Sequence, residues 1–173
     1  TYMATVSKNG LATLEFRSKV SAGQVVTNNL KMVSDMFLEA HYPLDGKADD
    51  TKGGKNGSLI SGAPTTDRFG REKKAISFDG SGMVTLPASF DTPGNMMTVT
   101  AWIKLDTLEG DNVIYYSGDN GKFFFFVNKD GNLGLTYELE ETATVTKLSN
   151  RTVPTGEWVH VAVNRYKDDL EFY

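Results

Sequence analysis

The chain has 173 residues, and its 18 lysines and arginines against 22 acidic residues give a formal net charge of −4 at neutral pH. This balance offers no general attraction to phosphate backbones or anionic membranes, so we expect no nucleic-acid partner and no membrane insertion. The absence of cysteine excludes disulfides, thiolate metal sites and a cysteine nucleophile. The length suits one buried core plus an extension, and the many glycines favour an all-β fold.

Residues 1–38 are expected to form an N-terminal extension, an assembly or linker segment, ahead of a domain at 39–173. Alternation from Leu11 to Phe16 indicates a strand. From Asn28 to Phe37 apolar residues recur at helical spacing, which predicts a short helix. A continuous strand running into Tyr42 is the alternative.

A polar, glycine-rich loop follows at 47–57, and then a short strand is expected at Ser58–Ile60. Long loops on a β scaffold often carry binding groups, although an ordinary connection is the preferred interpretation. The segment Asp67–Gly70 is expected to turn. The basic residues around it, Arg68 to Lys74, are interpreted as a solvated loop in preference to a phosphate site.

The stretch from Ala75 to Leu105 is the expected nucleus of the fold. Ile76 and Phe78 precede a turn at Asp79–Gly82, which predicts two short strands meeting across a tight connection. From Met97 to Leu105 apolar and polar residues alternate with a period of two, which is typical of a strand with one buried face.

Further strands are expected along the rest of the chain. Phe123–Val127 is apolar on both faces, as in a central strand covered on each side. The Asp130-Gly131 turn predicts a hairpin onto Leu133–Tyr137. Trp158–Asn164 places its valines on one face, and another strand begins at Leu170. Together these segments predict a two-sheet antiparallel sandwich.

Several segments, in this order and spacing, resemble the laminin-G-like members of the concanavalin A-like lectin/glucanase superfamily. The segments that carry the resemblance are His41–Gly46, Asp67–Gly70, Ala75–Gly80, Thr98–Lys104 and Pro154–Val163. The resemblance covers roughly residues 38–173. It implies a jelly roll of two antiparallel sheets, one of them concave. It also implies a binding module on a surface protein, adhesin or phage fibre, placed extracellularly, on a cell surface or on a virion.

The resemblance also implies that the jelly roll is incomplete at its C-terminus, because relatives continue past Leu170–Tyr173 with further strands. Three explanations remain open: the chain continues, residues 1–38 supply the strand, or a neighbouring copy donates it by β-augmentation. Donation would make the protein a homo-oligomer.

Four aromatic residues are the candidate ligand-binding groups for a glycan or surface protein. Glycans stack on aromatic faces and bond to polar side chains on a sheet or its rim. Trp102 points to the side of Thr98, Thr100 and Lys104, although packing beneath a loop is the alternative for its ring. The candidates are Trp102, Tyr115, Tyr116 and Tyr137.

Calcium is the one cofactor that the sequence leaves open, because hard cations bind oxygen ligands. Asp45 and Asp79, with Asp49 and Asp50 close in sequence to the first, lie in or beside turns where carbonyls could complete a shell. Alternatively, Asp45 and Asp79 form Asx-turns before glycine.

Catalysis is not expected. Glycosidases need two flanking carboxylates, and Glu138 and Glu140 share a face of one segment but lack the Glu-x-Asp-x-(x)-Glu pattern of the family's glucanases. The preferred function is a noncatalytic recognition or adhesion module. The alternative is a structural subunit of a fibre, capsid decoration or appendage assembled through strand exchange, and a glycoside hydrolase comes third.

Overall fold

The computed structural model describes residues 2–6, 14–18, 38–87, 96–117, 123–139, 143–167 and 169–173. Within these ranges the regular structure is entirely β, as expected, and the strand pairs are antiparallel. The helix predicted between Asn28 and Phe37 lies outside the described residues.

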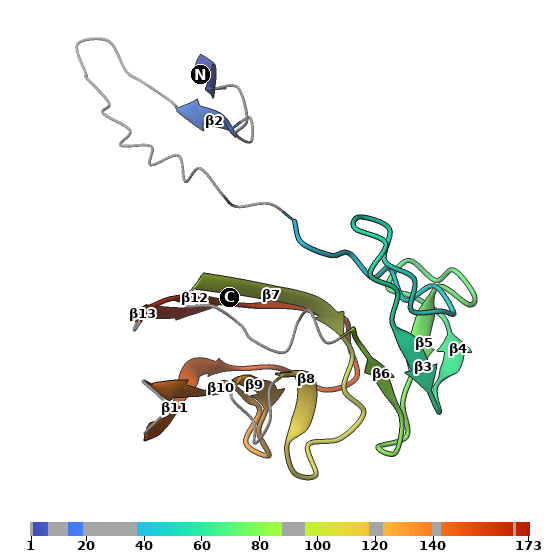
Figure 1. The fold of residues 1–173 in the computed structure, drawn as a ribbon. Helices are drawn as coiled ribbons and strands as arrows, with labels where there is room; N and C mark the ends of the chain where they lie inside the picture. The colour runs from blue at the N-terminus through green and yellow to red at the C-terminus, as the bar shows by residue number, and fades with distance from the viewer. Residues whose placement is uncertain are drawn as a thin grey trace, which may run out of the picture.

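Two sheets face each other and form the sandwich, as the two layers in Figure 1 show. The four-stranded sheet has the order β11-β10-β9-β8, and the three-stranded sheet has the order β13-β12-β7. Their strands are β7 (Met96–Ile103), β8 (Asn112–Ser117), β9 (Phe123–Val127), β10 (Asn132–Leu139), β11 (Ala143–Thr152), β12 (Val159–Tyr166) and β13 (Asp169–Phe172). The sandwich predicted from the two-residue alternation is therefore confirmed.

The core lies between the two sheets. Phe123, Phe125 and Val127 of β9 are fully buried, and they meet Val161 and Val163 of β12 from the opposite layer. Burying a side chain of this size contributes roughly 1.5–3 kcal/mol. The alternate residues of β7 close the same core from its edge, where they stay half-buried.

The hairpin between β9 and β10 forms where Asp130-Gly131 predicts it. Gly131 has a φ of 85°, a left-handed conformation that glycine adopts without steric cost. The side chain of Asn128 accepts hydrogen bonds from the backbone N–H of Asp130 and of Asn132, at 3.0 and 2.8 Å. These bonds fix the register of β10 on β9.

Two small ladders lie beside the sandwich, and they correct one prediction. The expected strands on either side of Asp79–Gly82 form as β5 (Ala75–Ser77) and β6 (Met83–Thr85), but they do not pair with each other. Instead β5 pairs with β4 (Ala63–Thr65), and β6 pairs with β3 (Ser58–Ile60).

This pairing goes with a corner at which the chain bends twice, once between β3 and β4 and once between β5 and β6. Gly82 lies so close to the carbonyl oxygen of Ser61 that an added Cβ would be 1.9 Å from it. Ser61 has a positive φ of 56°. The chain therefore leaves one ladder and enters the other at this contact, which a tight hairpin would not allow.

A separate antiparallel hairpin joins β1 (Tyr2–Val6) to β2 (Leu14–Ser18), with Ala4 opposite Phe16. The strand predicted from Leu11 to Phe16 thus overlaps β2.

Candidate functional site

The four predicted ligand-binding aromatic residues lie in three different places: the outward face of each sheet and the core between them. Trp102 is 46% exposed on the outward face of β7, and Tyr116 is 55% exposed on the outward face of β8. Tyr115 packs inward, edge-on to Phe123 with ring centroids 5.9 Å apart. The structure therefore does not bring the four together in one site.

Tyr137 is a core residue. Its side chain is 2% exposed and belongs to the core cluster. The buried guanidinium of Arg165 lies 4.3 Å from the centre of its ring, and Arg165 Nε donates a hydrogen bond to the carbonyl of Lys167. This ring is covered on the inside of the sandwich, so the structure corrects its assignment to a ligand surface.

The most developed surface group surrounds Trp102. We call it the Trp102 cluster, and its members are Arg68, Phe69, Arg71, Trp102 and His160. Trp102 and His160 lie opposite each other on β7 and β12, with ring centroids 5.2 Å apart. The other three members come from the loop between β4 and β5, which reaches the outward face of the sheet. The ring of Trp102 therefore packs against this loop, which is the alternative expected for it, and it still remains substantially exposed.

Asp67 holds that loop in shape. Its buried carboxylate accepts hydrogen bonds from the backbone N–H of Phe69 and of Arg71, both at 2.9 Å, and from Arg71 Nε at 2.8 Å. The Arg71 terminal nitrogen adds an ion pair at 2.6 Å. Burial raises the pKa of Asp67, but the bonds from Arg71 and Phe69 outweigh it, and the pKa lies below its ordinary value.

Arg68 lies between two aromatic rings. Its guanidinium carbon is 4.3 Å from the ring centre of Phe69 and 4.5 Å from that of Trp102. Phe69 is 63% exposed. An arginine stacked in this way contributes cation–π attraction and leaves its in-plane donors directed outward. The cluster thus presents exposed aromatic ring surface beside a cation.

Sequence reasoning missed Arg68, Phe69 and His160 as members of this group. The only signal was the Asp67–Gly70 segment with Arg71 directly after it, which places two arginines around an exposed phenylalanine. That segment was interpreted as a turn, which it is, because Gly70 N–H bonds to the carbonyl of Asp67 at 3.0 Å. No local pattern indicates that this turn meets a tryptophan more than thirty residues later.

The outward face of the four-stranded sheet is the second candidate surface. Tyr116, Phe124, Thr136 and Thr146 form one row across its four strands. A parallel row consists of Val113, Phe126, Gly134 and Leu148. Neither row carries a charge, and the Tyr116 and Phe124 rings meet edge-on at 6.2 Å.

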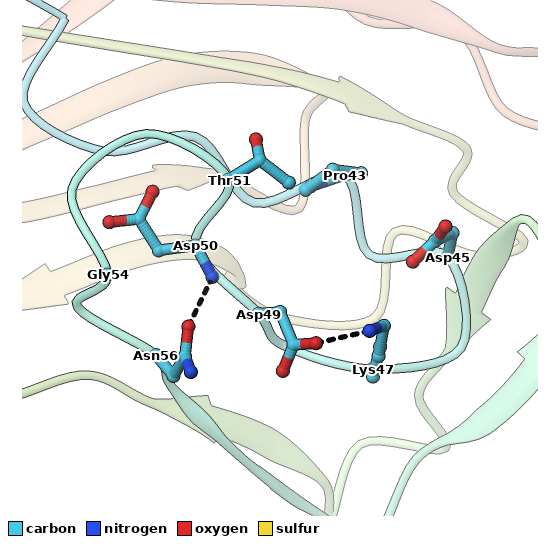
Figure 2. Close-up of a pocket in the computed structure, with 8 residues that line it drawn as sticks. All are labelled: Pro43, Asp45, Lys47, Asp49, Asp50, Thr51, Gly54 and Asn56. Carbon is cyan, nitrogen blue, oxygen red and sulfur yellow. Dashed lines mark hydrogen bonds and ion pairs between the residues drawn. The ribbon is translucent and has the colours of Figure 1, made fainter.

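A hollow of about 450 Å³ opens in the loop between Pro43 and Asn56, and Figure 2 shows its lining. The carboxylates of Asp45 and Asp50 lie on opposite sides of it, and Asp49 forms an ion pair with Lys47. The acidic groups therefore do not converge on one point.

Asp50 organises this loop. Its carboxylate accepts backbone N–H bonds from His41, Lys52, Gly53 and Lys55 at 2.8–3.0 Å. The bond from His41 has the largest effect, and together the four bonds outweigh burial and hold the pKa of Asp50 well below its ordinary value of 3.8. This carboxylate closes the loop and has its hydrogen-bonding capacity occupied.

The two predicted calcium ligands have partners of other kinds. Asp45 Oδ2 accepts a bond from Lys74 Nζ at 3.1 Å. Asp79 accepts from the N–H and hydroxyl of Ser81, an Asx-turn. Among the residues that the structure describes, no three acidic or histidine side chains gather as metal ligands would. Calcium at Asp45 or Asp79 stays a prediction.

The two facing antiparallel sheets, with ring-bearing outward faces, define a lectin-like β-sandwich. Residues 78–173, more than half of the chain, match the family described as the concanavalin A-like lectin/glucanases superfamily, in its laminin G group. The chain belongs to this superfamily. No curated protein and no solved structure matches it. The match begins at Phe78, so the resembling segments at His41–Gly46 and Asp67–Gly70 precede it.

Laminin G-like and lectin-type domains of this superfamily generally bind carbohydrate or protein and are generally noncatalytic, and laminin G-like domains are typically extracellular. In the described part of the chain, no helix has the length and apolar character required to cross a membrane.

Proposed function

We propose that this protein is a noncatalytic recognition module that binds carbohydrate through the Trp102 cluster, at the surface of a cell or virion. The observation that carries the proposal is the pair of exposed rings, Trp102 and Phe69, held on either side of Arg68. The surface location is supported by the typical placement of domains in this superfamily.

The chemistry of the cluster suits a sugar. The C–H face of a pyranose ring is apolar and packs on aromatic faces, while its hydroxyls need polar partners at the rim. Phe69 and Trp102 supply the faces, and Arg68 and His160 supply nitrogen groups beside them. The loop is already closed by Asp67, so little conformational entropy is lost when a ligand binds.

The test is a glycan array followed by isothermal titration with the best ligand. Trp102→Ala and Phe69→Ala are each expected to weaken binding about tenfold or more, since each removes a contact face. Tyr116→Ala is the matched control, because it removes an aromatic ring of similar exposure from the other sheet. Loss of binding in Tyr116→Ala alone would move the site to the four-stranded sheet, and absence of any glycan binding would refute the proposal.

A second candidate function, a subunit assembled through strand pairing, is favoured by the outer edge of β7, which pairs with none of the described strands. Its eight residues, MMTVTAWI, contain no charge and no proline. The other outer strands carry devices that discourage pairing. These are Asp169 and Glu171 on β13, Lys147 and Arg151 on β11, and a bulge between Val113 and Tyr115 on β8.

The backbone N–H and C=O groups of β7 that point away from β12 can be assigned to particular residues. Ala162 and Tyr173 exchange N–H to carbonyl bonds at 2.9 and 3.0 Å, so Ala162 faces β13. Because bonding direction alternates along a strand, Val161 and Val163 face β7, where they meet Ala101 and Val99. The N–H and carbonyl groups of Thr98, Thr100 and Trp102 therefore point to the outer edge, which no other described strand pairs.

A second copy can pair with this edge in antiparallel register. With Thr100 opposite its own equivalent, Thr98 lies opposite Trp102 and Val99 opposite Ala101, so inward residues stay inward. Sedimentation of the full chain is expected to show a dimer. Thr100→Pro, which removes only an outward N–H on an edge strand, is expected to be a folded monomer. A monomeric wild type, or a dimer that Thr100→Pro leaves intact, would contradict this assembly.

A further inference from the structure

The charge of Arg68 is not matched by an acid in the described part of the chain. Its neighbour Arg71 is paired with Asp67 through two nitrogen atoms. The described ion pairs include none with Arg68. The Trp102 cluster therefore presents one uncompensated cation beside its two exposed rings.

The stacked position of Arg68 determines what it can bind. A guanidinium between two ring faces keeps its N–H donors in the plane between them, where they form a fork that matches a carboxylate. Arg68 is exposed, so its charge is accessible to an anion in solution. The backbone of the loop that carries Arg68 is closed before binding, because Asp67 N–H donates to the carbonyl of Arg71 and Gly70 N–H donates to the carbonyl of Asp67, both at 3.0 Å.

We propose that the Trp102 cluster selects saccharides that carry a carboxylate, with the carboxylate on Arg68 and a sugar ring on Phe69 or Trp102. This inference rests on the proposed carbohydrate site and names the class of its ligand. The guanidinium fork forms two parallel hydrogen bonds with a carboxylate, and because it can do the same with a tetrahedral oxyanion, the test includes a sulfated polymer.

The test compares two polymers that differ in the charge of one group. Polygalacturonate carries free carboxylates, and fully methyl-esterified pectin carries the same sugar without the charge. By isothermal titration, the full chain is expected to bind polygalacturonate about tenfold or more tightly than the ester. Arg68→Gln is expected to abolish that difference, and Arg68→Lys to recover part of it.

Arg151→Gln is the matched control, because Arg151 is an exposed arginine on β11 in the other sheet. It is expected to retain the preference for polygalacturonate. If Arg151→Gln weakens binding as much as Arg68→Gln, the effect is general electrostatic attraction and the inference is overturned.

The remaining outcomes separate this inference from the proposed function. Equal binding of both polymers, lost together in Trp102→Ala, would overturn the preference for an acid and leave the carbohydrate site intact. Binding of dextran sulfate without binding of polygalacturonate would overturn the choice of carboxylate. Failure to bind any saccharide, charged or neutral, would refute the site itself.

Discussion

Gly134 is the position where a single methyl group should disturb a whole surface. It lies on β10 opposite Phe126, and a Cβ built at Gly134 would be 2.4 Å from the Cζ atom of the Phe126 ring. That ring is buried although it belongs to the outward face, because it lies flat over the glycine. Gly134→Ala must therefore push the ring away from its place beside Phe124.

The magnitude follows from two opposing effects. Exposing a buried phenylalanine side chain loses about 1.5–3 kcal/mol. Replacing glycine by alanine within a strand returns about 0.5–1 kcal/mol, because the unfolded chain has less freedom to lose. We expect Gly134→Ala to lower the free energy of unfolding by about 1–2 kcal/mol.

A double-mutant cycle in urea isolates the contact. In a Phe126→Ala background the added methyl group meets no ring, and Gly134→Ala is expected to be neutral or stabilising. The same destabilisation in both backgrounds would show that the methyl group clashes elsewhere, and a stabilising effect in the wild type would show that the ring moves without loss.

Four further outcomes are expected. Phe125→Ala should lower the free energy of unfolding by about 3–5 kcal/mol in urea, because it empties the centre of the core, and a loss below about 1 kcal/mol would contradict that placement. Tyr137→Phe should leave glycan affinity unchanged by titration, because the ring is not at the surface, whereas weaker binding would return it to the site. The pKa of Asp50 is lowered on folding, so its contribution to the free energy of unfolding is complete above its ordinary pKa of 3.8 and is lost as the pH falls through the lower folded value. Asp50→Asn should therefore make the melting temperature depend less on pH between about pH 4 and pH 2. An unchanged pH dependence would assign the acid sensitivity to other groups. Calcium should raise the melting temperature of the wild type and not that of an Asp45→Asn, Asp79→Asn double variant, whereas identical melting with calcium and with a chelator would remove these residues as ligands.

The two-residue alternation predicted the sandwich because it reflects a local property of the strand backbone. From Met97 to Leu105 it places Trp102 with Thr98 and Thr100 on one face, and the structure puts that face outward. The uninterrupted apolar run Phe123–Val127 predicts a central strand, and β9 does lie between β8 and β10, although Phe124 and Phe126 lie on the outward face of the sheet.

The same alternation applies to Tyr137, but it does not distinguish Tyr115 from Tyr116. Tyr137 shares a face with Leu133 and Leu135, which already indicates the core. Tyr115 and Tyr116 are different, because a bulge in β8 after Val113 shifts the register. The alternation alone could not show which of the two tyrosines would face outward.

Contacts between distant segments account for the rest. The pairing of β5 with β4 depends on the corner at Ser61 and Gly82, which no local pattern contains. The Trp102 cluster depends on a loop that ends at Arg71 reaching a strand that begins at Met96. Such contacts join segments that are distant in sequence, so they are known only once the fold is known and no local sequence pattern predicts them.

The Trp102 cluster is structurally independent of the core that supports it. None of Arg68, Phe69 and Arg71 belongs to the core cluster, and the loop is closed by Asp67 through its own hydrogen bonds. Substitutions at Arg68 or Phe69 can therefore change the ligand without emptying the core, whereas substitutions at Asp67 would release both residues at once. On this argument the sheets determine where the proposed site lies, and the loop between β4 and β5 supplies the residues proposed to select its ligand.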